Sequence, residues 1–152
     1  MNHDAIATLV YRYCRALDRL DADLLRSVFH PGAEIDMGAI YRGGVDGFID
    51  VAMGFMGSME STRHCVSNLL VEGDKVEAYV DAWHLLPGPT ELIVRARYLQ
   101  TVTEHNGAMA IARHAEVIDF GTQRPVNTGW FAGEIGLPRG CRGRDDPSYA
   151  AA

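Results

Sequence analysis

The stretch that decides the fold is residues 62–120, which read TRHCVSNLLVEGDKVEAYVDAWHLLPGPTELIVRARYLQTVTEHNGAMAIARHAEVIDF. β-Branched and aromatic residues are frequent in it, and turn-forming residues interrupt it at 73–74 (GD), 87–89 (PGP) and 106–107 (NG). These breaks predict four strands, at 62–72, 75–86, 91–104 and 108–120. Since short turns join antiparallel strands, each strand is expected to pair with the next.

The residues before this stretch have a helical pattern. Apolar side chains recur every three or four residues over 4–17, which predicts a helix with one buried face. Asp21 can cap a second short helix that runs to Phe29, and His30-Pro31-Gly32 would end it. A short strand at 33–42 and a third helix at 45–56 follow. Helices first and a sheet afterwards indicate an α+β fold.

Length and charge narrow the class of protein. A chain of 152 residues fits one domain, here 1–152, with one sizeable core. The net charge is −6 and no Lys/Arg cluster precedes the C-terminal residues, which argues against a nucleic-acid partner. No apolar run reaches the length of a membrane span, and the first residues do not resemble a secretory signal. We therefore expect a cytoplasmic protein with no membrane association.

The metal-binding residue types show no ligand spacing. The three cysteines are far apart, and the six histidines form no HExxH or HxxxH motif. This pattern predicts neither a metal site nor a disulfide framework, and we expect no cofactor.

Polar residues occur on strand faces that are otherwise apolar. Strict alternation places His64 and Asn68 on one face of strand 62–72 with valine and leucine, and His84 at the end of the apolar set of strand 75–86. In strand 108–120 the same rule places Arg113 among apolar side chains. Either these faces turn toward solvent at their ends, or the polar groups converge in an apolar cavity.

Two residues of the first helix could join them. Asp18 lies at the C-terminal end, where the helix dipole disfavours a carboxylate, so a partner elsewhere would explain it. His64 is one candidate, giving an Asp–His proton-transfer pair, and a surface ion pair with Arg15 is the alternative. Tyr13 lies on the apolar stripe of the same helix. It either packs its ring against the core or donates a hydrogen bond into the cavity.

Three segments carry a family resemblance: YRYCRALDRLD at 11–21, HCVSNLLVEGD at 64–74, and Arg97-Tyr98. In their order and spacing the chain resembles the SnoaL-like branch of the nuclear-transport-factor-2-like superfamily over about residues 3–121. The resemblance implies a cone-shaped fold, in which a curved antiparallel sheet wraps the N-terminal helices around a deep pocket. It also implies a homodimer or higher homo-oligomer. Independently of the resemblance, the tail 122–152 is rich in Gly, Pro and Arg, which predicts a cover over the pocket, a contact with a second subunit or a partly ordered end.

The resemblance implies an activity as well. It is greatest to cofactor-independent dehydratase-type lyases, which eliminate a small group from an apolar hydroxylated or carbonyl compound by means of an Asp–His dyad. The matching catalytic positions are His64, Asp18, Tyr13 and Arg113. The residues expected to bind the substrate are Asn68, His84, Tyr98 and Phe55.

Two other functions stay open at this stage. A ketosteroid-isomerase-like or cyclase-like enzyme would need a carboxylate base in the pocket, for which Asp36 and Asp119 are the candidates. A noncatalytic small-molecule-binding protein would share the fold without the chemistry.

Overall fold

The protein is described by a computed structural model over residues 2–128 and 136–150. Its helices are α1 (His3–Arg19), α2 (Ala22–Ser27) and α3 (Val45–Gly57), with a short 3-10 helix η1 (Pro147–Tyr149) near the end. Its strands are β1 (Phe29–Asp36), β2 (Arg42–Gly43), β3 (Ser61–Glu72), β4 (Lys75–Leu86), β5 (Thr90–His105) and β6 (Ala108–Pro125). The three helices and the four long strands predicted from sequence are confirmed, and the fold is α+β.

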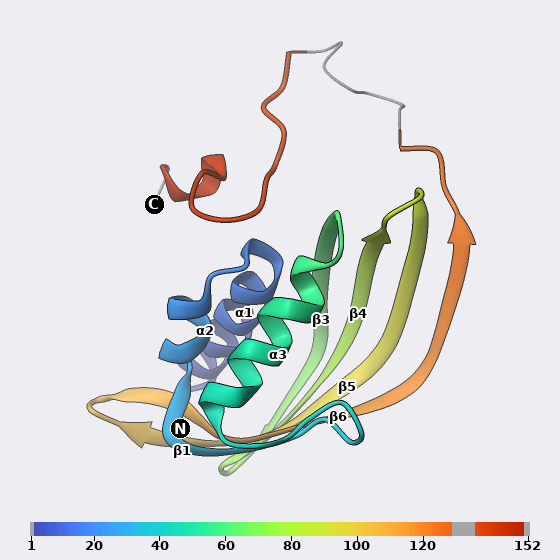
Figure 1. The fold of residues 1–152 in the computed structure, drawn as a ribbon. Coiled ribbons are helices and arrows are strands. Elements are labelled where there is room, and N and C mark those ends of the chain that lie inside the picture. Colours follow the sequence, from blue (N-terminus) through green and yellow to red (C-terminus); the bar gives the residue numbers. More distant parts are fainter. Residues whose placement is uncertain (1, 129–135, 151–152) are drawn as a thin grey trace.

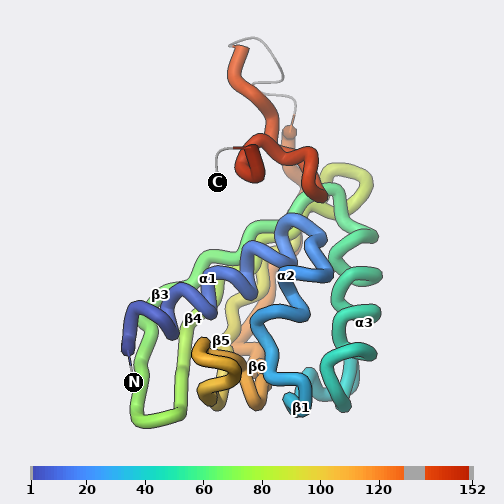
Figure 2. Tube along the Cα trace, turned by 90° about the vertical axis from the view of Figure 1, so that its left-hand side faces the viewer, coloured from blue at the N-terminus to red at the C-terminus, as the bar shows by residue number. Residues whose placement is uncertain are grey.

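The six strands form one sheet in the order β2-β1-β6-β5-β4-β3. The neighbours from β3 to β6 pair antiparallel, whereas β1 runs parallel to β6. The sheet is strongly curved and does not close, and α1, α2 and α3 lie against its concave face (Figure 1). Turned by 90°, Figure 2 shows α1 alongside β3 and α3 on the opposite flank, so the helices fill the hollow of the sheet.

Helix α1 has a capping residue at each end and one buried face. The side chain of Asn2 accepts a hydrogen bond from the amide of Asp4 and caps the N-terminus. The helix stops at Leu20, which has a left-handed φ of 53° and closes the last turn through its own amide. Its buried face consists of Ile6, Leu9, Val10, Tyr13, Cys14, Ala16 and Leu17. Asp21 caps α2 by accepting from the amide of Leu24, as predicted.

The strand predicted at 33–42 begins earlier and is interrupted. Helix α2 ends at Ser27, and β1 starts at Phe29, so Pro31 lies within the strand and does not terminate a helix. The pairing of β1 with β6 is irregular between Phe29 and Glu34. Proline, which has no N–H to donate, is tolerated at such an interruption of the ladder. A turn after Asp36 then leads to the two-residue strand β2.

A β-bulge in β6 reverses the alternation that the sequence predicted. Thr101 pairs with Arg113 and Val102 pairs with Ile111, which leaves Ala112 as an extra residue. Beyond a bulge, each side chain points to the face opposite to the one that strict alternation assigns. His114 is therefore fully buried and Arg113 is exposed.

A second bulge lies in β3. Ser67 pairs with Tyr79 and Leu70 pairs with Glu77, so that two residues of β3 stand opposite one of β4. One of the two, Asn68, has a φ of 49° and is exposed. Asparagine tolerates this left-handed conformation better than most residues. The alternation of inward and outward side chains in β3 is thus displaced by one residue at Asn68.

The described part of the tail returns to the helices. The amide of Gly143 donates to the carbonyl of Arg19 at 2.6 Å, and Arg19 pairs with the buried Asp146 at 3.4 Å. The hydroxyl of Tyr149 donates to Asp21 at 2.7 Å. Residues 136–150 therefore lie beyond the C-terminal ends of α1 and α3 and the N-terminal end of α2 (Figure 2). Whether the tail covers a pocket or contacts a second subunit stays a prediction, and residues 129–135 lie outside the described part.

Candidate active site

The site is built on the end of α1 and the start of β3. Asp18 lies in the last turn of α1, and its carboxylate accepts three hydrogen bonds from β3. The hydroxyl of Thr62 donates to Oδ1 at 3.0 Å, and the backbone amide of His64 donates to Oδ2 at 3.0 Å. These donors offset the unfavourable position of a carboxylate at a helix C-terminus.

The third bond joins the two side chains. Nδ1 of His64 lies 2.7 Å from Oδ1 of Asp18, and the side chains are only 3% and 13% exposed. A carboxylate can only accept, so Nδ1 carries the proton, and in the neutral imidazole Nε2 keeps its lone pair. Nε2 has no hydrogen-bond partner among the described residues. The imidazole is thus held in the tautomer that can accept a proton.

His64 lies on the wall of an apolar cavity of about 160 Å³ between the helices and the sheet. An apolar cavity of about 150 Å³ is large enough for a benzene ring. The apolar part of the wall consists of Leu17, Met37, Ile40, Phe48, Val51, Ala52, Phe55, Met56, Ala82, Val94 and Ile118. The polar part consists of Tyr13, His64, His84, Tyr98 and Glu116. A few polar groups in an apolar hollow are typical of a small-molecule site.

Three of the four predicted substrate-binding residues lie on this wall. Phe55 is 48% exposed, and His84 and Tyr98 are buried. Nδ1 of His84 donates to the carbonyl of Leu92 at 3.2 Å, and its ring meets that of His64 edge to face, with 5.6 Å between centroids. Burial and then the neighbouring His64 lower the pKa of His84, which favours the neutral imidazole. Burial raises the pKa of Tyr98 well above its usual value.

Tyr13 is connected to a buried polar chain that the sequence did not reveal. Its hydroxyl lies 3.1 Å from Nε2 of His114, whose Nδ1 lies 3.0 Å from Nε2 of Gln100. With the amide in this orientation Gln100 donates to Nδ1, so Nε2 of His114 carries the proton and donates to Tyr13. The phenol proton of Tyr13 is then free to point into the cavity. Burial lowers the pKa of His114 to about 3 and raises that of Tyr13, so both are neutral.

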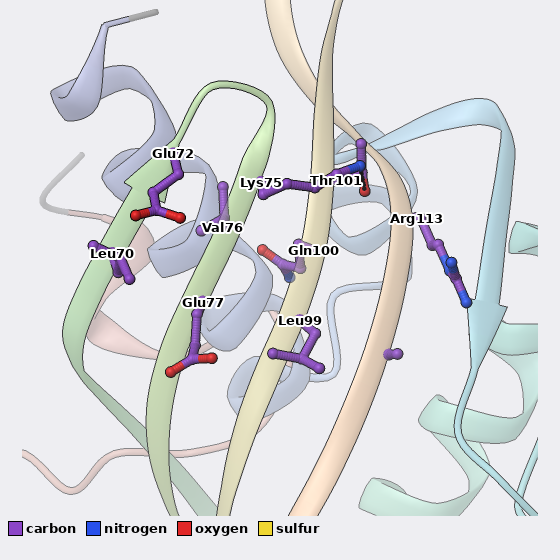
Figure 3. A pocket seen from close by; sticks show the side chains of 10 residues that line it. Leu70, Glu72, Lys75, Val76, Glu77, Leu99, Gln100, Thr101 and Arg113 are labelled. Atoms are coloured by element: carbon purple, nitrogen blue, oxygen red, sulfur yellow. Dashed lines mark hydrogen bonds between the residues drawn. The ribbon is translucent and has the colours of Figure 1, made fainter.

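Arg113 and Asn68 are not brought to the cavity. Arg113 lines an open depression on the outer face of the sheet with Leu99 and Glu77 (Figure 3). Asn68 is exposed in the bulge of β3. In both strands the bulge, which the alternation pattern does not reveal, turned the predicted residue outward. Neither residue contributes to the site described here.

The carboxylates considered for an isomerase also lie elsewhere. Asp36 pairs with Arg42 and Asp119 with Arg97, and each of the two carboxylates is 43% exposed. Neither lines the cavity. The carboxyl group that does so is Glu116, which the predicted alternation placed on the opposite face. A shift of one residue within β6 would have identified it.

Arg142 is a further residue near the site that the sequence pattern does not reveal. Its guanidinium donates to the carbonyls of Leu17, Met56 and Met59 at 3.2 to 3.5 Å, between the C-terminal ends of α1 and α3. Burial lowers its pKa, and the charge of Asp18 acts in the opposite direction. No local motif marks this contact, because it joins residues more than 80 positions apart.

Within residues 2–128 and 136–150, no three His, Cys, Asp or Glu side chains are arranged to hold a metal ion. No helix in this part of the chain is long and apolar enough to span a membrane.

The curved sheet with helices in its hollow and a partly polar cavity defines a small-molecule-binding α+β fold. Residues 2–115 match the family of SnoaL-like domains, and the chain belongs to this family. Its fold is that of the nuclear-transport-factor-2-like proteins.

Solved structures give the same fold. A provisionally named scytalone dehydratase from Novosphingobium aromaticivorans has a TM-score of 0.73 and 22% identity, covering 90% of this chain and 94% of the other. A hexachlorocyclohexane dehydrochlorinase from Novosphingobium barchaimii has a TM-score of 0.69 and 20% identity, covering 90% and 94%. A provisional aromatic ring hydroxylase from N. aromaticivorans has a TM-score of 0.70 and 22% identity, covering 79% and 91%. The comparison with curated proteins gives no match.

Proposed function

We propose that this protein is a cofactor-independent lyase that eliminates water, or another small leaving group, from a small and mostly apolar hydroxy-carbonyl compound. The observation that carries the proposal is the 2.7 Å hydrogen bond between Nδ1 of His64 and Oδ1 of Asp18 on the wall of an apolar cavity. The structural likeness to a provisionally named scytalone dehydratase and to a dehydrochlorinase supports this class of reaction.

The proposed reaction starts with proton removal by His64. Nε2 accepts a proton from the carbon next to the substrate carbonyl, and the electron pair of that C–H bond forms the new double bond as the bond to the leaving group breaks. Asp18, hydrogen-bonded at Nδ1, stabilises the imidazolium that results and holds the ring in the reactive tautomer. The phenol of Tyr13 donates to the carbonyl oxygen as negative charge develops there.

The size and polarity of the cavity limit the substrate. Its volume of about 160 Å³ suits a compound with one ring, and its walls are mostly aliphatic and aromatic. A β-hydroxy ketone that carries a phenyl group has these properties. Its product is a conjugated enone, which absorbs in the near ultraviolet.

The test is elimination by the purified protein across single-ring β-hydroxy ketones, with the loss of water followed by mass spectrometry. Wild-type protein should form the enone, and His64→Ala should lower kcat by about 10²–10⁴. Arg63→Ala, on the neighbouring exposed position of β3, should leave kcat unchanged. If compounds of this class bind but are not turned over, the protein is a noncatalytic binder and the proposal fails.

A further inference from the structure

Glu116 is a carboxyl group on the cavity wall with no partner of its own. It lies on β6 opposite Tyr98 of β5, two residues beyond His114. The bulge at Ala112 turns its side chain toward the helices, and it lines the same cavity as His64. Among the described residues no group donates a hydrogen bond to it or forms an ion pair with it.

An ionised carboxyl group without a hydrogen-bond or ion-pair partner in an apolar cavity raises the free energy of the folded protein. The group avoids this when it is protonated or when a ligand binds to it. The titratable groups that interact electrostatically with Glu116 are His64, Tyr13, Tyr98 and Cys14, and of these only His64 can carry positive charge. His84 also lines the cavity, and its lowered pKa favours the neutral imidazole. Burial raises the pKa of Glu116, and the charge of His64 opposes that shift. A neutral carboxylic acid has an O–H to donate, which the other carboxyl group of the site, Asp18, lacks because it accepts three hydrogen bonds.

We propose that Glu116 is the general acid of the reaction, which donates its proton to the departing hydroxyl oxygen while His64 removes the proton from carbon. The inference rests on the proposed function and adds a second catalytic residue to it. It also specifies the substrate class: the leaving group is a hydroxyl, which departs from carbon far more easily as water than as hydroxide.

The proton balance closes without a co-reactant. The C–H bond breaks with its proton on Nε2 of His64, the C=C bond forms, and the C–O bond breaks. The oxygen takes the proton of Glu116 and leaves as water. The enzyme is then left with an imidazolium on one wall and a carboxylate on the other, and transfer of one proton from His64 to Glu116, directly or through water, restores both.

The first experiment needs no substrate. Infrared difference spectra of wild type against Glu116→Gln at neutral pH should contain the carbonyl stretch of one protonated carboxylic acid, lost in the variant. Glu77→Gln, a substitution on the outer face of the same sheet, should leave that band in place. If the band is absent from wild type, Glu116 is ionised and the inference is overturned, whatever the activity of the protein.

The second experiment compares two leaving groups. The probes are a phenyl-substituted β-hydroxy ketone and its acetate ester, because acetate leaves as a stable anion without a proton. Glu116→Gln should lower kcat for the hydroxyl compound by at least about a hundredfold and change kcat for the ester by less than about fivefold. Glu116→Asp, which keeps the acid, should recover part of the activity on the hydroxyl compound.

The outcomes separate the two proposals. Equal losses for both probes in Glu116→Gln, or no loss for either, overturn the acid role and leave the His64 base in place. If wild type turns over neither probe, the proposed elimination fails for this class of substrate, and the infrared band alone decides whether Glu116 is a neutral acid.

Discussion

Replacing Asp18 with asparagine tests the dyad with almost no change of shape. The amide must present either its oxygen or its NH₂ group to Nδ1 of His64, which now lies 2.7 Å from a carboxylate oxygen. If the oxygen faces Nδ1, the NH₂ group meets the backbone N–H of His64, and two donors oppose each other. If the NH₂ group faces Nδ1, His64 must move its proton to Nε2 and can no longer act as a base.

The size of the effect follows from the charge that is lost. With charge centres about 4 Å apart and an effective dielectric constant of about 20, an ion pair contributes about 4 kcal/mol. The pair is nearly buried, so solvent screens it little. At about 1.4 kcal/mol for each factor of ten in rate, removing the carboxylate should lower kcat by about 10²–10³, since the amide dipole replaces part of the interaction.

The assay is kcat for enone formation from a phenyl-substituted β-hydroxy ketone, followed by absorbance. Asp50→Asn, at an exposed position of α3, is the matched control and should behave like wild type. Circular dichroism establishes that each variant is folded. A folded Asp18→Asn protein that retains kcat within a factor of about three would refute the role assigned to the pair.

Two further predictions concern stability. Burial holds the pKa of His114 at about 3, so between about pH 6.5 and 3 the unfolded chain binds a proton there that the native protein does not. The free energy of unfolding of the wild type should therefore fall with decreasing pH, by up to about 1.4 kcal/mol per pH unit more than that of His114→Gln. Urea titrations at several pH values measure this free energy, and the same pH dependence in both proteins would contradict the prediction. Arg142→Met removes a cation from the ends of two helices and should lower the free energy of unfolding by about 1–2 kcal/mol, whereas Arg139→Met at an exposed position should not.

Much of the fold follows from local signals that the structure confirms. The turn sequences between the strands are short and specific, so the ends of β3, β4 and β5 and the start of β6 lie within one residue of the predicted positions, whereas β6 runs to Pro125 and not to residue 120. The apolar stripe of α1 is wide and regular, and it predicts both the helix and its buried face. The start of β1 could not be predicted in this way, because its parallel pairing with β6 joins segments far apart in the chain.

The site is predictable only where side-chain periodicity is unbroken. His64 and His84 lie in regular parts of β3 and β4, and both face the cavity as strict alternation indicates. Arg113 and Asn68 lie at bulges, where one extra residue reverses the faces of the side chains up to the next register shift. A bulge has no reliable sequence signal other than an occasional glycine or asparagine, as at Asn68.

The bulge in β6 also explains why this cavity has its particular chemistry. If β6 kept all its residues and alternated strictly from Ile111 onward, Arg113 would face the helices and His114 and Glu116 would face outward. With the bulge, the wall of β6 instead offers a carboxyl group at Glu116 and supports the phenol of Tyr13 through His114.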